Sequence, residues 1–332
     1  MRVNFFSALG LILVAGLSSA CSDRPVGSKQ RPFALFFVPS VDAGKLATNG
    51  EKLSKFVSQR VSQGLYGKDD GFYVKTAIPT SYVAVVEALG TKKADFVIFT
   101  TYAYILARDI KGYPVDAVFT VLRGPKAKAT TGGQIIVRTD SGINKVEDLN
   151  GKKFAFVDPA STTGFVLPSR LLKDKGVVVG QTVFGQKHDN VVTMVYQGQV
   201  DGGAVYHQDS DIEIVNGKPV ERIRDARARV MTQFPDVDKK VKIIALTPEI
   251  PGEPWAIRTN LFEDAALNEK VRDLVTKAVF DFSSTEDGKV LLEQVATGVG
   301  LSEIKDSDYN GIREMVKDAQ VNIQEVIAGQ KK

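Results

Sequence analysis

Short apolar runs alternate with segments of helical spacing along most of this 332-residue chain. The runs at 34–38, 73–78 and 96–99 have the length and composition of buried strands. Residues 47–65 and 82–89, which lie between them, carry apolar side chains three or four positions apart. Strands that alternate with helices in this way form a mostly parallel sheet with helices on its faces. The chain is therefore predicted to be an α/β protein.

A break in this alternation divides the chain into two candidate lobes. Predicted strands at 118–122 and 135–137 are separated by Pro125, several lysines and the pair Gly132-Gly133, as expected where a chain crosses between lobes. A Pro-rich segment at 248–254 provides a return crossing. We predict that lobe I comprises residues 33–130 and 251–332, and that lobe II comprises residues 131–250.

The first 20 residues have the pattern of an export signal. Arg2 precedes a mostly apolar run at 5–17 and small residues at 18–20. This run is too short to be a good membrane-spanning helix. We predict that residues 1–20 are a signal peptide and that the polar residues 21–32, which include two prolines, are a tether.

Cys21 is the only cysteine of the chain. A lone thiol forms no internal disulfide, so the core must stabilise the exported protein. The position after Ala20 resembles the lipid-modified cysteine of bacterial lipoproteins, although Ser18 stands where an apolar residue is usual and Leu17 lies one place earlier. We expect the protein to lie in the periplasm or at the cell surface, anchored to a membrane by a lipid on Cys21. The alternative is a soluble periplasmic protein with a free cysteine.

Composition narrows the range of partners. The net charge is only +4 and the basic residues are scattered, which weakly supports an anionic ligand and predicts no nucleic-acid partner. No cysteine or histidine cluster has the spacing of a metal site, so we expect no metal and no cofactor. His188, Asp189, His207, Asp209 and Asp211 are the residues from which a metal site could be imagined.

Three consecutive hydroxyl residues at 161–163 follow the turn dipeptide Asp158-Pro159. The turn comes after an apolar strand at 154–157 and leads into a predicted helix at 165–174. Hydroxyl groups and unpaired backbone N–H groups at a helix start suit an anion. Ser and Thr are also ordinary helix caps, so a cap without a ligand is the alternative.

A second polar turn is predicted in the same lobe. His188 and Asp189 precede apolar residues at 191, 192, 195 and 196, which fit one helix face. Ligands of open α/β sheets bind at the carboxyl ends of the strands, where both turns are expected. The two turns together predict a ligand site.

Several motifs occur in an order that resembles one protein family. The most specific is Asp158-Pro159-Ala160-Ser161-Thr162-Thr163-Gly164 followed by His188. The others are Val38-Pro39-Ser40, residues 81–89, 94–107, 140–152 and 188–201, and Pro251-Gly252-Glu253-Pro254. Over residues 33–265 the chain resembles the phosphonate, phosphite and phosphate group of ABC-transporter substrate-binding proteins.

The resemblance implies a type II periplasmic-binding-protein fold, in which two α/β lobes close on a ligand. It also implies the extracytoplasmic solute-binding component of an ABC importer. Such a protein captures a phosphorus oxyanion without catalysis and delivers it to a permease in the inner membrane. The ligand-binding residues implied are Tyr82, Ser161, Thr162, Thr163, His188, Tyr206 and Glu253, with Glu253 placed toward an amino group of the ligand.

The chain departs from the family pattern in the half of the site that would hold an organic group. Thr100-Thr101 stand in place of a Gly-Pro-like pair, and Thr131 with Gly132-Gly133 replaces an aromatic residue. Tyr206 aligns with an expected acid, while Asp209 lies slightly later. Plain alternatives are a structural role for Tyr82 and a solvated loop carboxylate for Glu253.

Other functions compete with import. The same cleft would serve a ligand-sensing accessory lipoprotein for a sensor kinase, or the binding of another oxyanion such as a sulfonate. A serine hydrolase built on Ser161 and His188 is disfavoured because the chain lacks a Gly-x-Ser-x-Gly elbow at this turn. Enzymes of the thiamine-precursor type occur on related folds, but the export signal argues against them.

Overall fold

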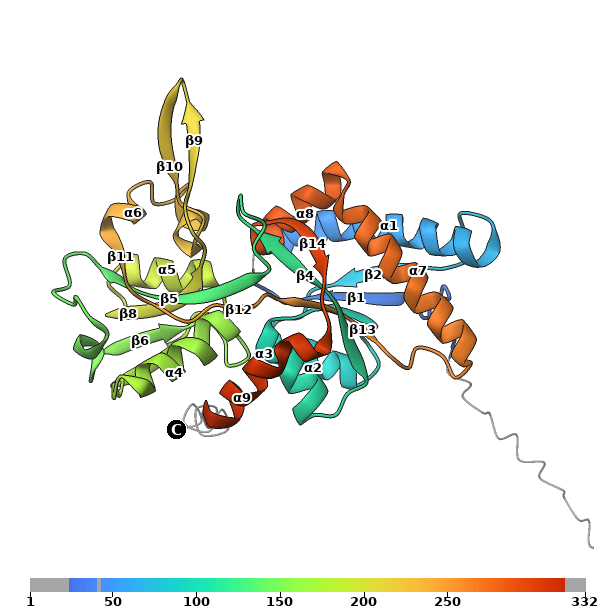
Figure 1. Cartoon of the computed structure of the whole chain (residues 1–332), viewed down its shortest axis with the longest axis horizontal. Helices are drawn as coiled ribbons and strands as arrows, with labels where there is room; N and C mark the ends of the chain where they lie inside the picture. Colours follow the sequence, from blue (N-terminus) through green and yellow to red (C-terminus); the bar gives the residue numbers. More distant parts are fainter. Residues whose placement is uncertain (1–23, 41–42, 320–332) are drawn as a thin grey trace, which may run out of the picture.

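Two sheets with helices on their faces build the protein in a computed structural model that describes residues 24–40 and 43–319 (Figure 1). The first sheet has the order β14-β4-β13-β3-β1-β2, and the second has the order β11-β5-β8-β6-β7 with β12 beside β5. The α/β prediction is confirmed. We call each sheet with its helices the first unit and the second unit.

The strands of the first sheet are β1 (Phe33–Phe37), β2 (Val74–Ala77), β3 (Phe96–Ile98), β4 (Val115–Arg123), β13 (Pro254–Arg258) and β14 (Gly298–Glu303). Those of the second are β5 (Thr130–Arg138), β6 (Lys153–Phe156), β7 (Gln181–Phe184), β8 (Gly202–His207), β11 (Val241–Leu246) and β12 (Ile250–Pro251).

Both sheets are mixed, so the expectation of mostly parallel strands is wrong. β1 pairs in parallel with β2 and β3, and β6 pairs in parallel with β7 and β8. β4, β13 and β14 pair antiparallel, and so do β5 and its neighbours β8, β11 and β12. A helical crossover is needed only between parallel neighbours. Because β5 and β13 enter their sheets from the other unit, no crossover helix links them to the neighbouring strands, and they can pair antiparallel.

Helices cover both faces of the first sheet (Figure 1). α1 (Ala43–Tyr66), α7 (Ala265–Ser283) and α8 (Glu286–Ala296) pack together on one face, whereas α2 (Tyr82–Gly90) and α3 (Thr101–Ile105) lie on the other. In β3, Phe96 and Ile98 therefore join the apolar cluster of α1 and α7, and Val97 joins that of α2. Burial on both faces explains the uninterrupted apolar run of this strand.

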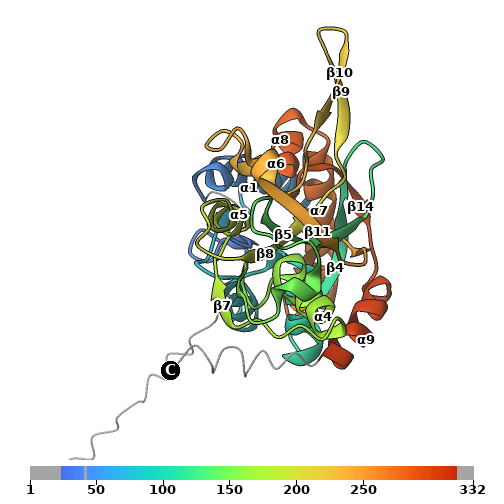
Figure 2. The ribbon, with the colours of Figure 1, turned by 90° about the vertical axis from the view of Figure 1, so that its left-hand side faces the viewer.

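In the second unit, α4 (Leu167–Asp174) and α5 (His188–Tyr196) lie on opposite faces of the sheet (Figure 1). A hairpin of β9 (Asp211–Val215) and β10 (Lys218–Arg222) projects from this unit (Figure 2). A 3-10 turn, η4 (Ala226–Val230), and α6 (Val237–Lys240) follow, and α9 (Asn310–Ala319) ends the described chain. The hairpin and β14 escape prediction because charged residues and glycines interrupt their apolar patterns.

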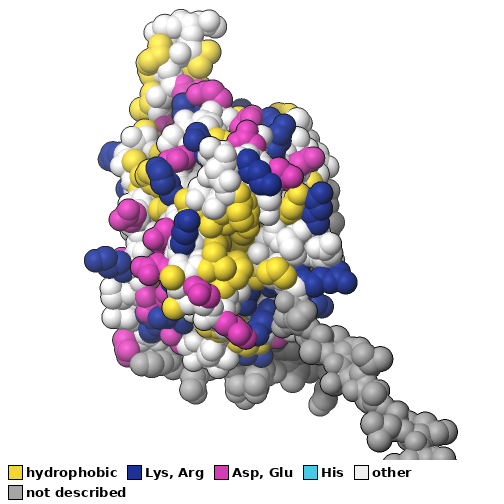
Figure 3. Space-filling model, turned by 90° about the vertical axis from the view of Figure 1, so that its right-hand side faces the viewer, with side chains coloured by type: hydrophobic (Ala, Val, Ile, Leu, Met, Phe, Trp, Pro, Cys, Tyr) yellow, Lys and Arg dark blue, Asp and Glu magenta, His cyan; other side chains and the backbone are white. Residues whose placement is uncertain are grey.

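The predicted signal peptide, residues 1–20, and Cys21 lie outside the described residues. Within the described part of the chain, no helix has the length and apolar character needed to cross a bilayer. On the face shown in Figure 3, basic and acidic side chains are mixed around a short hydrophobic strip. This mixture agrees with the small net charge of +4.

A buried ion pair ties three segments of the first unit together. The Asp95 carboxylate, whose side chain is 1% exposed, lies 2.6 Å from Arg258 Nη2 and 3.1 Å from Arg31 Nη2. Its other oxygen accepts a hydrogen bond from the Ala34 N–H at 2.9 Å. The carboxylate thus joins β1, β13 and the segment that precedes β1.

We predict that Asp95→Ala lowers the free energy of unfolding by about 3–5 kcal/mol, because it leaves the guanidinium of Arg258 buried without its partner. Lys277→Ala is the control, since the Lys277 side chain is 74% exposed in its pair with Asp281. That change is expected to cost less than about 1 kcal/mol. Urea unfolding measures both, and equal effects would contradict the assignment of Asp95.

Candidate functional site

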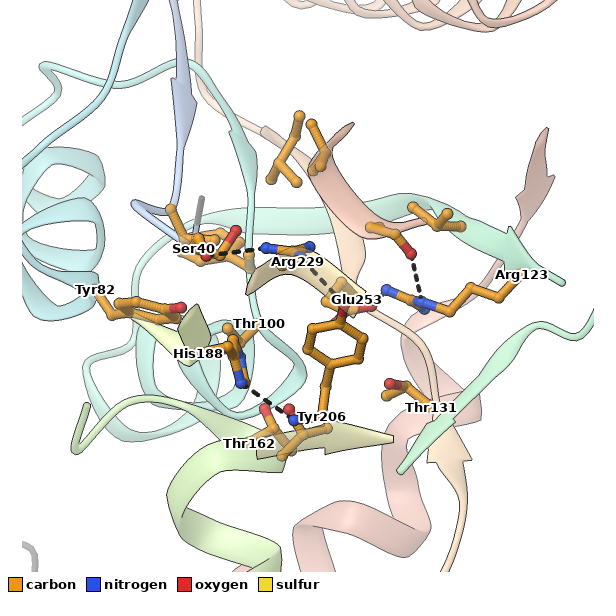
Figure 4. A pocket seen from close by; sticks show the side chains of 17 residues that line it. Ser40, Tyr82, Thr100, Arg123, Thr131, Thr162, His188, Tyr206, Arg229 and Glu253 are labelled. Carbon is orange, nitrogen blue, oxygen red and sulfur yellow. Dashed lines mark hydrogen bonds and ion pairs between the residues drawn. The ribbon is translucent and has the colours of Figure 1, made fainter. Parts of the chain in front are cut away.

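A small cavity lies between the two units, and we call it the central cavity. It has about 40 Å³ of space for the centre of a water-sized sphere. Since one water needs roughly 10–15 Å³ by this measure, the space suits about three waters or one compact oxyanion. Its polar lining residues are Ser40, Tyr82, Thr100, Arg123, Thr131, Thr162, Thr163, His188, Tyr206, Arg229 and Glu253 (Figure 4).

The hydroxyl run divides into a helix cap and two cavity-lining residues. Ser161 Oγ accepts a hydrogen bond from the Gly164 N–H at 3.1 Å, and Ser161 does not line the cavity. Thr162 and Thr163 do line it, at the start of a π-helical turn, η3 (Thr162–Val166), that continues into α4. Ser161 is thus the N-cap of this turn, and its role as a ligand contact stays a prediction.

Contacts with the first unit position this hydroxyl turn. Thr162 Oγ1 accepts a hydrogen bond from the Tyr102 N–H at 2.8 Å, at the start of α3. Thr100, the N-cap of α3, donates from Oγ1 to the Ala160 carbonyl at 2.7 Å. Both bonds join the units, so the hydroxyl turn and the helix start hold each other at the cavity wall.

A close approach of β5 explains one departure from the family pattern. A Cβ atom built on Gly133 would lie 2.6 Å from the Thr163 carbonyl oxygen. The Gly133 N–H also donates to Thr247 Oγ1 at 2.7 Å, which fixes the strand at this place. A residue with a side chain would displace the hydroxyl turn, so glycine stands where an aromatic residue was expected.

His188 is held as a neutral hydrogen-bond donor. Its Nδ1 accepts the Tyr206 N–H at 3.1 Å, so the proton of the neutral ring is on Nε2. Burial, and to a smaller extent the Arg229 guanidinium, lower the pKa of His188 from 6.5 to about 3. The Tyr206 ring lies edge-on to the imidazole with centroids 5.0 Å apart. The ring therefore stays neutral and oriented near neutral pH.

Arg229, whose side chain is 15% exposed, brings a largely buried positive charge to the central cavity. It lies in η4, and its Nε donates to the Tyr206 hydroxyl at 3.0 Å while Nη1 donates to the Ser40 carbonyl at 3.2 Å. The guanidinium carbon lies 4.9 Å from the centroid of the Tyr206 ring. Burial opposes the charged form, but Tyr206 and Asp189 raise the pKa of Arg229 above its usual value. Arg229 therefore stays charged.

Tyr82 presents its phenol to the cavity from the start of α2. The side chain is 1% exposed, and the hydroxyl has no hydrogen-bond partner among the described residues. Burial, with the carboxylate of Asp158 next, raises the pKa of Tyr82 far above its usual value. The hydroxyl thus remains a donor, and an unpaired buried donor calls for an acceptor in the cavity.

At the other end of the cavity, Glu253 forms an ion pair with Arg123 Nη2. Figure 4 shows Tyr82, Thr100 and His188 on one side of the cavity and Arg123 and Thr131 on the other. Each end of the cavity thus offers its own set of polar groups.

The donor set shows what chemistry the cavity permits. A phenol, a neutral imidazole N–H, a guanidinium and two hydroxyls fit an anion with several oxygens. In the described residues no group of three His, Cys, Asp or Glu side chains is arranged to hold a metal ion. Among the described residues that line the cavity, Glu253 is the one carboxylate, and it is already paired with Arg123.

Comparison with known proteins identifies the family. The model of the ABC-transporter phosphonate periplasmic substrate-binding protein matches residues 35–309. The chain belongs to this family. The phosphonate-binding family consists of binding proteins of ABC transporters, which are not enzymes.

Two known proteins are similar to this chain in sequence, and one solved structure is similar to it in fold. A phosphate-import protein of Mycolicibacterium smegmatis is 28% identical over 225 residues, 62% of this chain and 66% of that protein. The phosphonates-binding periplasmic protein of Escherichia coli is 24% identical over 235 residues, 68% of this chain and 61% of that protein. The chain thus spans less than two thirds of the length of either relative.

The solved structure is that of PhnD1 from Prochlorococcus marinus in complex with methylphosphonate. It aligns with a TM-score of 0.67 and 17% identity over 87% of this chain and 98% of that chain. This similarity confirms the type II periplasmic-binding-protein fold.

The central cavity contains six of the seven residues implied by the family resemblance: Tyr82, Thr162, Thr163, His188, Tyr206 and Glu253. Sequence reasoning missed Arg229 and Arg123. Arg229 lies in a short turn without strong periodicity, and Arg123 ends a strand before a loop rich in lysine. Neither residue stands in a family motif, so only the fold reveals them.

We predict that the free energy of unfolding falls by about 2 kcal/mol through His188 between pH 7 and pH 5. The unfolded chain binds a proton below pH 6.5, whereas folded His188, with a pKa of about 3, does not. Protonation therefore favours unfolding as the pH falls. Denaturant titrations at both pH values are expected to show a smaller loss for His188→Gln than for the parent.

The matched control is His207→Gln, at the other histidine of the chain, which contacts Gln134 at 2.8 Å. This variant should retain the contribution of His188. Equal losses in the parent and in His188→Gln would show that His188 does not resist protonation.

Proposed function

We propose that the protein is the extracytoplasmic solute-binding component of an ABC importer and captures a phosphorus oxyanion in the central cavity. The observation that carries this proposal is the convergence of three buried or largely buried donors, the Tyr82 hydroxyl, the His188 N–H and the Arg229 guanidinium. Phosphonate, phosphite and phosphate are the candidate ligands. The phosphate-import and phosphonates-binding names of two relatives support this ligand class.

The proposed contacts follow from charge and geometry. Arg229 neutralises part of the anion's charge, and hydrogen bonds to a charged group are roughly twice as strong as those between neutral groups. Tyr82 donates from the first unit, and Thr162, Thr163 and His188 donate from the second. Because the ligand is held from both sides, it favours the closed arrangement over an open one.

Closure is proposed to occur about the two crossings between the units. The proposed lobe boundaries are residues 33–130 with 251–332, and residues 131–250. The crossing near β12 contains Glu253, which lines the central cavity. The crossing before β5 contains Lys128, whose Nζ lies 2.8 Å from an Asp209 carboxylate oxygen and 3.2 Å from a Glu249 carboxylate oxygen. The ion pairs of Lys128 therefore lie next to the proposed hinge.

Export and anchoring complete the proposal. A signal peptide at residues 1–20 and a lipid on Cys21 would hold the protein at the outer face of a membrane. In that position it delivers the ligand to the ABC permease. The tether predicted at 21–32 is shorter than expected, because Val26 is buried and Arg31 pairs with Asp95 in the first unit. A single acyl chain binds a membrane only weakly, so a stable anchor requires more than one. Intact-mass measurement of the mature protein tests the anchor, and cleavage without an acyl increment contradicts it.

The ligand class is tested by calorimetric titration of the purified mature protein with methylphosphonate, phosphite, phosphate and methanesulfonate. At least one phosphorus ligand is expected to bind and to raise the melting temperature, because a ligand that binds only the folded state stabilises it. The proposal fails if no phosphorus ligand releases heat or changes the melting temperature. Tighter binding of methanesulfonate would assign the site to sulfonates instead.

We predict that Tyr82→Phe weakens binding of the best phosphorus ligand by about 1–3 kcal/mol, or roughly 5- to 150-fold in Kd. The stability of the unliganded protein should stay the same or rise, because the change removes a buried hydroxyl that has no partner in the protein. Calorimetry and thermal unfolding measure the two effects.

Tyr113→Phe is the matched control for this variant. Tyr113 lies in the first unit away from the cavity, and its hydroxyl donates to Glu87 at 3.2 Å. Its loss should leave Kd unchanged. If Tyr82→Phe binds the ligand as tightly as the parent and Tyr113→Phe do, Tyr82 is no ligand contact.

A further inference from the structure

Arg123 has a buried guanidinium nitrogen that the protein does not use. The residue ends β4 and is only 6% exposed. Its Nε donates to the Ala296 carbonyl at 2.9 Å, and its Nη2 pairs with Glu253. Its Nη1 is buried and has no hydrogen-bond partner among the described residues. A charged donor without an acceptor is costly to bury, so this nitrogen indicates a group that arrives from outside.

The backbone at Gly252 lies close to this nitrogen. A Cβ atom on Gly252 would lie 3.2 Å from Arg123 Nη1 and 2.7 Å from Thr120 Oγ1. A side chain at this position would therefore press on Arg123 Nη1, and glycine lets the backbone approach the guanidinium closely. Figure 4 shows Arg123 and Thr131 at the side of the cavity opposite Tyr82.

A second cavity shares these two lining residues. It has about 120 Å³ of space for the centre of a water-sized sphere, and Arg123 and Thr131 line both cavities. Its lining includes Lys126, Lys128 and His207 as well as Asp209 and Glu249. Lys128 pairs with both acids. A ligand longer than one compact oxyanion would reach this second cavity past Arg123 and Thr131.

The charge balance at Arg123 opposes a cationic ligand group. Glu253 is the carboxylate expected to meet a ligand's amino group, but the Arg123 guanidinium already neutralises it. An ammonium group placed there would lie against Arg123 Nη1 and be repelled. A carboxylate would instead receive a charge-assisted hydrogen bond from Nη1 and a second one from the Thr131 hydroxyl.

We propose that the end of the central cavity at Arg123 and Thr131 binds a carboxylate, and that the preferred ligands are phosphonates with a carboxylate one or two carbons from the phosphorus-bearing end. This inference rests on the proposed binding of a phosphorus oxyanion at the other end. Arg123 then acts as the specificity residue, and Glu253 holds its guanidinium in place rather than contacting an amine.

The test compares ligands of similar length by calorimetry with the mature protein. The probes are phosphonoacetate, 3-phosphonopropionate, 2-aminoethylphosphonate, propylphosphonate and methylphosphonate. One of the two carboxylated probes should bind about tenfold or more tightly than both propylphosphonate and 2-aminoethylphosphonate, as expected for a charge-assisted bond in a buried site. Tighter binding of 2-aminoethylphosphonate, or equal binding of propylphosphonate, would overturn the inference.

Two variants separate the roles of the paired residues. Arg123→Gln leaves Glu253 without its cation, so the preference should shift about tenfold or more toward 2-aminoethylphosphonate. Glu253→Gln keeps the guanidinium and should preserve or increase the preference for the carboxylated probe. Thermal unfolding checks that each variant is folded. If Arg123→Gln does not fold, Glu253→Gln alone decides the test. Loss of the preference for the carboxylated probe in Glu253→Gln would contradict the proposed role of Arg123.

The outcomes also distinguish this inference from the proposed function. If methylphosphonate binds but no carboxylated probe binds more tightly, the oxyanion site stands and the carboxylate site is refuted. If inorganic phosphate alone binds, the cavity holds only a compact anion and Arg123 has no ligand role. If no phosphorus compound binds, both the function and this inference are overturned.

Discussion

The structure depends on the contact between the hydroxyl turn of the second unit and the helix starts of the first. Thr162 accepts the Tyr102 N–H and Thr100 donates to the Ala160 carbonyl, so two bonds cross between the units at one place. The Asp158 carboxylate accepts the Ala160 N–H at 2.8 Å, which fixes the turn before the hydroxyl run. The bond between Thr162 and Tyr102 gives a partner to a helix N–H group that would otherwise lack one. Tyr82 of the first unit and His188 of the second both line the cavity next to this contact, so each unit contributes donors.

Around that cavity, the protein combines neutral donors with the cation Arg229 and the ion pair of Arg123 and Glu253. His188 and Tyr82 cannot change charge near neutral pH, because burial lowers the pKa of the imidazole to about 3 and raises the pKa of the phenol. Arg229 supplies the positive charge and is fixed by Tyr206 and the Ser40 carbonyl. Donors that are fixed before the ligand arrives cost little to organise, which favours affinity. The paired Arg123 and Glu253 leave the other end nearly neutral, so the charge of the oxyanion is matched mainly at the Arg229 end.

Much of the fold could be predicted because each predicted strand or helix has a local pattern. The apolar runs that form β1 and β3 are buried on both faces, so their composition alone predicts strands. At 154–174, an apolar run, a hydroxyl cluster and a helical pattern follow one another, which predicts a turn between a strand and a helix. The strand directions could not be predicted, because they depend on the sheet that each crossing enters. Six of the site residues implied by the family resemblance line the cavity. They could be named from the sequence because the family motifs gave their positions. Ser161 required the structure, since a cap and a ligand donor look alike in sequence. Arg229 required it as well, because it reaches the cavity from a short turn after the β9–β10 hairpin.

The central claim is that donors from both units converge on one phosphorus oxyanion. A crystal structure of the mature protein with methylphosphonate tests it most directly. We expect the phosphonate oxygens to lie about 2.6–3.2 Å from the Tyr82 hydroxyl, His188 Nε2 and an Arg229 nitrogen, as in ordinary and charge-assisted hydrogen bonds. Methylphosphonate bound outside the central cavity, or bound there without contact to these three groups, would contradict the account.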